Sequence, residues 1–274
     1  MSLNFIILKK KDNFLRMKKY LRKIFNKISE NNLVYRLAAR LAYDHRGENN
    51  ADIDTNGERK ALEKFINRSH VIFDVGANEG DWTKTVLSMR PDVAIHCFEP
   101  SRRSFDKLTA NHFPSNVVLN NTGIGSKKEE KEFYIYGDSS TANSLFLRRH
   151  TALECDGKEK VMIDTIDDYC RRGNIPKIDF LKIDVEGYEL EAVKGAKKLF
   201  QEGNIAVAQI EYGGTYIDAG ISLKDIFDFF GDLDYKLYKI LPNNIMLIGK
   251  YKSDLENFQY ANYLAVKNNF IEKI

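Results

Sequence analysis

Short apolar segments alternate with amphipathic segments along residues 71–230, and this alternation limits the fold more than any other feature. Strands and helices in this order are typical of a parallel sheet covered by helices on both faces. The predicted strands are residues 71–75, 93–98, 117–120, 178–184 and 205–210. The predicted helices are residues 58–67, 81–89, 101–111, 188–200 and 223–230. The sequence therefore predicts an α/β fold.

Two further segments modify this sheet. Residues 235–241 and 245–250 look like strands on either side of a short turn at Pro242, so they must pair antiparallel. Residues 123–172 interrupt the alternation with strand-like stretches and a polar run at 139–144. Because connecting segments often carry binding residues, we expect this insertion to contact the substrate. The prediction is a mostly parallel sheet with an antiparallel C-terminal hairpin and one insertion.

Charge divides the chain into an N-terminal arm and the rest. Residues 1–46 hold 12 Lys and Arg against 3 Asp and Glu, a charge of +9, and the whole chain carries only +3. The remainder is therefore acidic, whereas nucleic-acid binders are typically basic. We predict an arm at 1–46, a polar linker at 47–57 and one catalytic domain at 58–274, with no nucleic-acid partner.

The arm itself has apolar residues at helical spacing from Phe14 to Ala42, with lysines and arginines among them. Three interpretations remain open: a helix docked on the core, a basic helix on an anionic membrane surface, or a segment that docks a protein partner. No apolar run reaches the roughly 18 residues that a membrane span needs. Three widely spaced cysteines fit reduced thiols. We therefore expect a cytoplasmic protein, on the inner face of the membrane if the arm binds lipid.

The clearest motif, residues 74–80, follows an apolar strand and precedes a helix. Gly76 and Gly80 allow a ligand close to the backbone, and the helix start offers unpaired N–H groups. The dinucleotide fingerprint would need a glycine where Asn78 stands. Asp74 and Glu79 also place negative charge where phosphates would lie. A cationic ligand such as S-adenosylmethionine fits this loop better than a diphosphate.

Acidic residues end the other strands. Glu99 ends the next strand, where a carboxylate can accept hydrogen bonds from both ribose hydroxyls of a nucleoside. Asp184, Glu186 and Glu211 follow or end later strands and can face the same crevice. They could cap helices, bind the acceptor or hold a divalent metal through oxygens, which the sequence permits but does not require. Of the histidines, only His150 lies where a base could act.

These motifs resemble the FkbM family of S-adenosylmethionine-dependent methyltransferases. The resemblance covers about residues 71–250 and rests on residues 73–80, 98–100, 161–169 and 178–189, with Lys194-Gly195-Ala196 behind them. It implies a seven-stranded Rossmann-like class I methyltransferase fold. It also implies methyl transfer to a hydroxyl oxygen, often of a sugar in a glycan or glycolipid precursor.

Together the residues and the resemblance give an expected site. The expected cofactor contacts are Asp74, Gly76, Asn78, Glu79, Gly80, Glu99, Ser101 and Asp184. The expected catalytic residues are Asp184, Glu211 and Glu186, with Glu211 as the preferred acceptor contact and base. The expected acceptor contacts are Asn143, Ser144 and Tyr212. Two alternatives remain at this point: a nucleotide-sugar or other nucleoside-binding enzyme, and a non-catalytic protein recruited to membranes.

Overall fold

A computed structural model describes residues 17–23, 25–28, 31–137, 140–149 and 153–271. The chain divides into two compact units, residues 1–46 and 47–274, which we call the arm and the body. In the arm, residues 17–23 and 25–28 are helical, and α2 spans Asn32–Arg46. Helix α2 buries none of its residues. Phe14, at the start of the predicted apolar stripe, lies outside the described residues.

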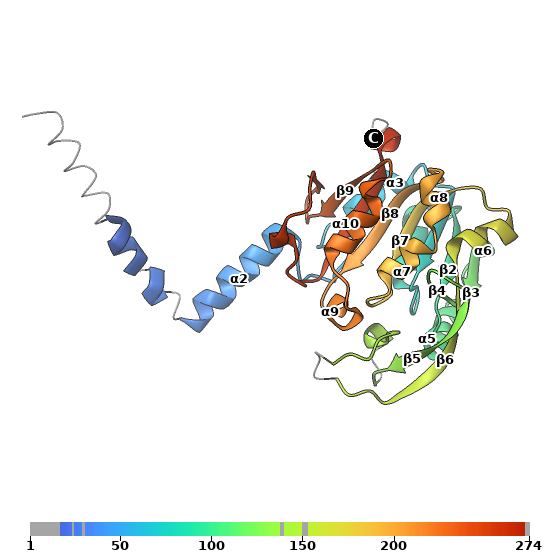
Figure 1. Ribbon diagram of the computed structural model, residues 1–274, viewed down its shortest axis with the longest axis horizontal. Helices are drawn as coiled ribbons and strands as arrows, with labels where there is room; N and C mark the ends of the chain where they lie inside the picture. The colour runs from blue at the N-terminus through green and yellow to red at the C-terminus, as the bar shows by residue number, and fades with distance from the viewer. Residues whose placement is uncertain (1–16, 24, 29–30, 138–139, 150–152, 272–274) are drawn as a thin grey trace, which may run out of the picture. The chain divides into compact units, whose positions relative to one another are not determined.

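The body is built on an eight-stranded sheet with the order β10-β9-β11-β8-β7-β1-β2-β3 (Figure 1). Its strands are β1 (Val71–Val75), β2 (Ala94–Phe98), β3 (Val117–Asn120), β7 (Ile178–Ile183), β8 (Ile205–Tyr212), β9 (Tyr235–Ile240), β10 (Ile245–Ile248) and β11 (Ala261–Lys267). Strands β3, β2, β1, β7 and β8 run parallel, and β11, β9 and β10 add antiparallel pairs. The predicted α/β fold with a mostly parallel sheet and an antiparallel C-terminal hairpin is confirmed.

The sheet departs from the prediction at one place. Strand β11 was not predicted, yet it lies between β8 and β9 and pairs antiparallel with both. The sheet therefore has eight strands rather than seven. Residues Ala261 to Val266 are all buried, so β11 lacks the alternation of exposed and buried side chains that marks a strand in sequence.

Helices cover both faces of the sheet, and side chains that alternate along each strand feed two apolar cores. Ile72 of β1 belongs to one core, with Leu62, Trp82 and Leu108, whereas the neighbouring Phe73 belongs to the other. The helices of the body are α3 (Glu58–Ile66), α4 (Asp81–Met89), α5 (Arg102–Thr109), α6 (Ile166–Gly173), α7 (Glu189–Lys194), α8 (Lys197–Gln201), α9 (Thr215–Ala219), α10 (Leu223–Gly231) and α11 (Asn268–Ile271). The short 3-10 helices are η1 (Ser140–Ala142) and η2 (Ser253–Leu255).

The insertion forms a second, three-stranded sheet of order β4-β6-β5. It contains β4 (Gly123–Ile124), β5 (Glu129–Ile135) and β6 (Gly157–Asp164), which include the two strand-like stretches seen in the sequence. Between β5 and β6, the chain passes through η1, so that residues 140–144 of the polar run lie next to the main sheet's carboxyl edge (Figure 1). Ser139 and His150 lie outside the described residues.

Residues 47–57, predicted as a linker, pack into the body. Glu48 is buried and its carboxylate lies 2.6 Å from the Lys239 ammonium of β9. Gly57 has φ +99°, and a Cβ there would lie 2.1 Å from the Leu241 carbonyl oxygen. This segment therefore has a fixed path over the end of β9.

Candidate active site

The loop after β1 packs tightly against the end of β7. Gly76 has φ +83°, and a Cβ there would lie 1.8 Å from the carbonyl oxygen of Asp184. Asn78 also has a positive φ, +47°, which asparagine tolerates better than most residues. Gly80, at φ +90°, is the N-cap of α4. The sequence of this loop thus brings the ends of two neighbouring strands into contact.

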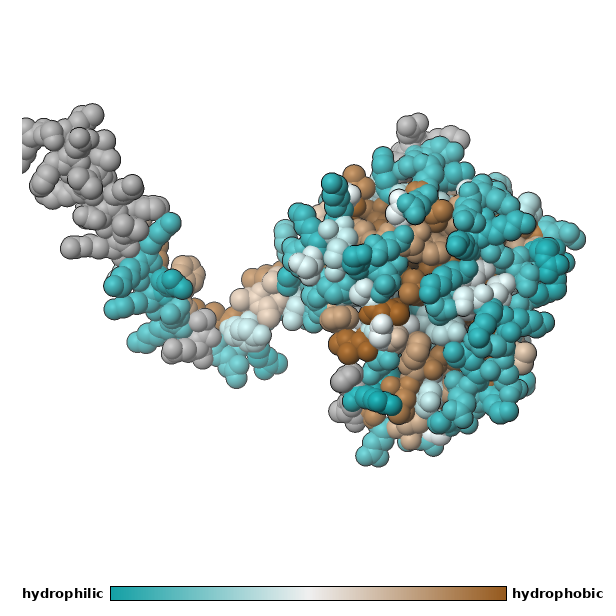
Figure 2. Space-filling model, in the orientation of Figure 1, coloured by the Kyte–Doolittle hydropathy of each residue, from teal (hydrophilic) through white to brown (hydrophobic). Residues whose placement is uncertain are grey.

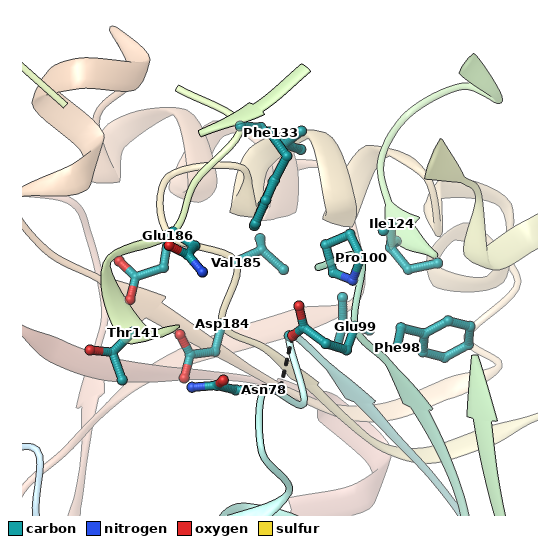
Figure 3. Close-up of a pocket in the computed structure, with 15 residues that line it drawn as sticks. Asn78, Phe98, Glu99, Pro100, Ile124, Phe133, Thr141, Asp184, Val185 and Glu186 are labelled. Carbon is teal, nitrogen blue, oxygen red and sulfur yellow. Dashed lines mark hydrogen bonds between the residues drawn. The ribbon is translucent and has the colours of Figure 1, made fainter. Parts of the chain in front are cut away.

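Glu99 links this loop to the end of β2. One carboxylate oxygen accepts a hydrogen bond from the backbone N–H of Asn78 at 2.9 Å (Figure 3). The other accepts one from the backbone N–H of Ser101 at 2.8 Å. Burial raises the pKa of Glu99 to about 7, against these two hydrogen bonds. The carboxylate is thereby fixed in position at the wall of a pocket.

This first pocket combines apolar walls with polar groups on its floor. Gly76, Asn78, Glu99 and Asp184 form its polar side, and Figure 3 shows Glu99 and Asp184 on either side of Asn78. Its apolar lining residues are Val75, Phe98, Pro100, Ile124, Phe133, Leu145 and Val185. A carboxylate beside apolar walls suits a nucleoside, whose base is flat and whose ribose carries two hydroxyl donors.

A second pocket adjoins the first. Both pockets are lined by Gly76, Asn78, Thr141, Asp184 and Glu186. The second pocket extends away from Glu99, and its further lining residues are Ala51, Ala77, Glu79, Asp81, Trp82, Lys182, Glu211 and Tyr260. Its position gives room for a second molecule next to whatever binds along Gly76 and Asp184.

Three carboxylates gather where the two pockets meet. One oxygen each of Asp184, Glu186 and Glu211 lies within 4.8 Å of the others. The Lys182 ammonium lies 2.7 Å from Asp184, and Arg148 of the insertion forms an ion pair with Glu186. The cluster therefore holds three acids and two fixed cations.

The acids of this cluster differ in their affinity for protons. Burial raises the pKa of Glu211 well above its usual value, and the neighbouring charge of Asp184 raises it further. Burial opposes ionisation of Asp184 as well, but Lys182 and a hydrogen bond with Glu211 hold its pKa below the usual value. Glu211 therefore takes up a proton more readily than Asp184, which stays ionised beside Lys182.

Glu186 occupies an unfavourable backbone conformation, with φ +54°. Such conformations cost free energy and tend to occur at functional sites. Burial raises the pKa of Glu186 to about 7, against the charge of Arg148. The same three carboxylates could also coordinate a hard divalent cation through oxygen atoms.

Asp74 lies beneath the loop and lines neither described pocket. Its side chain has no exposed surface, and it accepts a hydrogen bond from the Thr83 hydroxyl at 2.7 Å. The Lys182 ammonium lies 3.9 Å away. Asp74 thus supports the loop and Lys182 from below, and its second carboxylate oxygen has no hydrogen-bond partner among the described residues.

The remaining predicted residues divide between the site and its surroundings. Glu79 lines the second pocket and pairs with Lys107 at 2.6 Å. Asn143 lines the first pocket and accepts a hydrogen bond from the Tyr136 N–H. Ser144 is buried behind the pocket and donates to the Glu186 carbonyl at 2.7 Å.

Ser101 is buried, and its hydroxyl has no hydrogen-bond partner among the described residues. Gly80 packs against Leu108 and Phe113 instead of facing a pocket.

Tyr212, predicted as an acceptor contact, is in neither described pocket. Successive side chains of a strand point to opposite faces, so Tyr212 faces away from Glu211. Its hydroxyl contacts Glu256 and the Phe258 N–H, and its ring packs on Tyr216. The position of Tyr212 is that of a core residue.

The residues near the site that sequence reasoning missed include Lys182, Arg148, Tyr260 and Ala51. Lys182 lies near the end of β7 and Asp184 directly follows that strand, so a period of two brings both side chains to the same side of the sheet. Arg148 and Tyr260 come from the insertion and from the segment before β11, and no local pattern indicates where these segments pack.

Comparison with known proteins decides the family. Residues 74–237, more than half of the chain, match the model of the Methyltransferase FkbM domain. The chain belongs to this family. It is an S-adenosylmethionine-dependent methyltransferase, as the sequence motifs predicted, and neither a nucleotide-sugar enzyme nor a non-catalytic binding protein is favoured.

Two relatives of known activity are similar to this methyltransferase. Hexuronic acid methyltransferase AglP of Haloferax volcanii is 26% identical over 209 residues, covering 73% of this chain and 80% of AglP. The 2-O-methyltransferase NoeI of Sinorhizobium fredii is 26% identical over 140 residues, covering 47% of this chain and 58% of NoeI.

Solved structures are similar at a lower level. Methyltransferase FkbM from Methylobacillus flagellatus KT is 18% identical with a TM-score of 0.43, covering 72% of this chain and 43% of that one. The plantazolicin methyltransferase BpumL, solved in complex with SAH, is 10% identical with a TM-score of 0.43 and covers 95% and 99%.

The first pocket fits the nucleoside part of the cofactor. Glu99 is held so that a ribose could donate to it, and the carboxamide oxygen of Asn78 is buried without a hydrogen-bond partner among the described residues. An unsatisfied buried acceptor is costly, so it favours a ligand that donates a hydrogen bond there. Glu99 and Asn78 would therefore hold the cofactor along the loop after β1.

Proposed function

We propose that this enzyme transfers the methyl group of S-adenosylmethionine to a hydroxyl oxygen of a sugar in a glycan or glycolipid precursor. The observation that carries the proposal is the carboxylate cluster of Asp184, Glu186 and Glu211, at the junction of a nucleoside-shaped pocket and a second pocket. Two relatives support the acceptor class, since one is a hexuronic acid methyltransferase and the other a 2-O-methyltransferase.

The bound cofactor supplies an electrophilic methyl group on a sulfonium. Glu99 and Asn78 would hold its nucleoside end, and the loop at Gly76 together with Asp184 would hold its other end next to the second pocket. Alignment of acceptor and methyl donor supplies much of the rate acceleration that a methyltransferase needs. The walls of the second pocket include the aromatic side chains of Trp82 and Tyr260, which add apolar surface beside its carboxylates.

The carboxylate cluster provides an acceptor for the proton of the acceptor hydroxyl. On transfer of the methyl group to the acceptor oxygen, the ionised carboxylate of Asp184 would accept the hydroxyl proton. Glu211, whose pKa is raised, is hydrogen-bonded to Asp184, and Lys182 keeps Asp184 ionised before the reaction. This role for Asp184 revises the expectation that Glu211 is the base.

We further infer that the enzyme works in the cytoplasm, on the inner face of a membrane that residues 1–46 contact. The basic charge of the arm supports this inference. Among the described residues, the structure contains no helix both long and apolar enough to cross a membrane.

The test is direct transfer of label. Purified enzyme is incubated with methyl-labelled S-adenosylmethionine and the glycans and glycolipids of cells that lack the enzyme. We expect label on a sugar oxygen, located by mass spectrometry of the permethylated fragments. Label on protein or nucleic acid, with none on sugars, would contradict the proposal. A parallel sample with EDTA, with and without added Mg²⁺, tests whether the carboxylate cluster holds a metal.

A further inference from the structure

The described helical segments of the arm present an apolar face that no other described residue of the arm covers. Leu33, Leu37 and Leu41 follow each other at four-residue spacing on α2 and are exposed. Residues four apart lie on the same side of a helix, so these leucines form one stripe. Met17, Leu21, Phe25 and Ile28 of the preceding helical segments are exposed as well.

The same helical segments are rich in positive charge. Among the described residues 17–46, Asp44 is the only acidic side chain, and it pairs with Arg40. The basic residues of these segments are Lys18, Lys19, Arg22, Lys23, Lys27, Arg36, Arg40 and Arg46. Apolar and basic side chains on one helical segment are the combination that binds anionic membrane surfaces.

A second exposed apolar patch lies on the body. It consists of Leu147 of the insertion, 39% exposed, and Ile217 of α9, 43% exposed. The segments that carry them are joined, since the Arg149 N–H donates to the Asp218 carboxylate at 3.0 Å. Figure 2 shows hydrophobic residues gathered where α9 faces the insertion. We call Leu147 and Ile217 the apolar rim.

The apolar rim borders the catalytic cluster. Arg148, next to Leu147, forms the ion pair with Glu186. On the other side, α9 packs against Gly187, where a Cβ would lie 3.0 Å from the Thr215 carbonyl oxygen. Segments bearing the rim thus flank Glu186, which lines both pockets.

The root of the arm is also tied to the second pocket. Ala51 lines that pocket and follows the last arm residue, Arg46, by five positions. Five extended residues span at most about 17 Å. Glu48 and Asn49 are hydrogen-bonded to the body, so the short segment that joins the arm to this pocket is itself fixed on the body.

We propose that the acceptor sugar is carried on a lipid in an anionic membrane, which the arm binds and the apolar rim faces. The inference rests on the proposed function and adds the physical form of the substrate. A sugar bound to a lipid reaches the second pocket from the membrane surface, and its apolar portion lies along Leu147 and Ile217.

Vesicle flotation of the full chain tests the surface. The vesicles contain phosphatidylcholine alone or mixed with phosphatidylglycerol. We expect binding only to the mixed vesicles, weakening as salt rises. Each basic residue near an anionic surface contributes about fivefold in binding, so the variant Lys18→Gln, Lys19→Gln, Arg22→Gln, Lys23→Gln should bind at least about 100-fold more weakly. The matched control replaces the exposed lysines Lys128, Lys197, Lys236 and Lys252 of the body with Gln and should bind as the wild type does.

The apolar rim has its own variant, Leu147→Ser with Ile217→Ser. We expect about tenfold weaker vesicle binding from the loss of apolar contact. Its control is Met162→Ser, which changes an exposed apolar residue on β6. Binding of S-adenosylhomocysteine, measured by calorimetry, should be unchanged in all of these variants and shows that the body is folded.

The two proposals fail in different ways. No binding to mixed vesicles, or equal binding by the wild type and the arm variant, would overturn the lipid surface. Label from S-adenosylmethionine found only on water-soluble glycans would overturn the lipid-linked acceptor and leave sugar methylation intact. Label on no glycan at all would overturn the proposed function, whatever the vesicles show.

Discussion

The absence of a side chain at Gly76 allows the loop after β1 to pack against the end of β7. At Gly76, the space for a side chain is taken by the carbonyl oxygen of Asp184, 1.8 Å from an ideal Cβ. The positive φ of this residue adds a backbone cost for any other amino acid. The backbone at Gly76 therefore sets the distance between the cofactor loop and the catalytic cluster.

Gly76→Ala should abolish cofactor binding, because the loop must move away from Asp184 to accept a Cβ. The measurement is calorimetry with S-adenosylhomocysteine. Gly231→Ala is the matched control, since a Cβ there meets nothing within 4 Å and should leave affinity unchanged. Normal affinity in Gly76→Ala would show that this close contact does not shape the site.

Glu99→Ala should weaken S-adenosylhomocysteine about 10- to 150-fold, the loss expected when hydrogen bonds to a charged group disappear. The wild type should also lose affinity as the pH falls below about 7, because Glu99 takes up a proton near that pH. This pH dependence should be absent in Glu99→Ala. Glu130→Ala, at an exposed position of β5, serves as the control. An unchanged affinity in folded Glu99→Ala would remove Glu99 from the cofactor site.

The acid pair Asp184 and Glu211 allows a comparison of roles. Asp184→Asn should lower turnover about 10²- to 10⁴-fold, the usual contribution of a proton acceptor. Glu211→Gln should cost less than about tenfold, because the amide can still donate to Asp184. Initial rates with the labelled acceptor, at matched thermal stability, give both values. A loss in Glu211→Gln as large as that in Asp184→Asn would return the base to Glu211.

At the level of elements, sequence patterns predicted those parts of the fold that local chemistry determines. The boundaries of β1, α4 and β3 agree with prediction, because each begins and ends at a change in polarity. The predicted helix at 188–200 is two helices, α7 and α8, which are separated at Gly195. Gly195 packs closely against Gly125, because a Cβ on Gly195 would lie 2.1 Å from the carbonyl oxygen of Gly125. Such a contact between distant segments leaves no local signature.

The same distinction holds for the site. Glu99 and Asp184 were predictable, because parallel strands place their carboxyl ends at one edge of the sheet. The ion pair of Arg148 with Glu186 was not, because it depends on how the insertion folds back over that edge. Residues contributed by long-range packing thus escape a reading of local motifs.

The insertion should control acceptor binding rather than cofactor binding. Arg148→Met removes the cation that faces Glu186 and loosens the insertion at the junction of the two pockets. We expect a higher KM for the acceptor, by about tenfold, the effect of one charge-assisted hydrogen bond. Affinity for S-adenosylhomocysteine should stay within twofold. A pure loss of cofactor affinity would mean that this contact supports the first pocket instead.

At the scale of the whole molecule, the active site buries several carboxyl groups in the protein interior. Glu99, Glu186 and Glu189 are all buried carboxyls with raised pKa values, about 7, 7 and 8. Glu189 accepts hydrogen bonds from the N–H groups of Val185 and Gly187, which shape the turn before α7. Function at this edge of the sheet is thus obtained at the expense of stability, and the cost must depend on pH.

Thermal unfolding should show this dependence. In the unfolded chain these glutamates ionise near pH 4.5, whereas the folded protein keeps their protons up to about pH 7 or 8. The folded state therefore binds more protons across this window, and the free energy of unfolding must fall as pH rises, by about 1.4 kcal/mol per pH unit for each group. Asp184 and Asp179, whose pKa values are lowered, act in the opposite direction only at lower pH.

Calorimetric Tm should thus decrease from about pH 5.5 to about pH 8 and level off above it. Glu189→Gln should have a shallower decrease, because one of the groups that take up protons on folding is gone. A Tm that stays constant or rises over this range would show that these carboxyls are ionised in the folded protein.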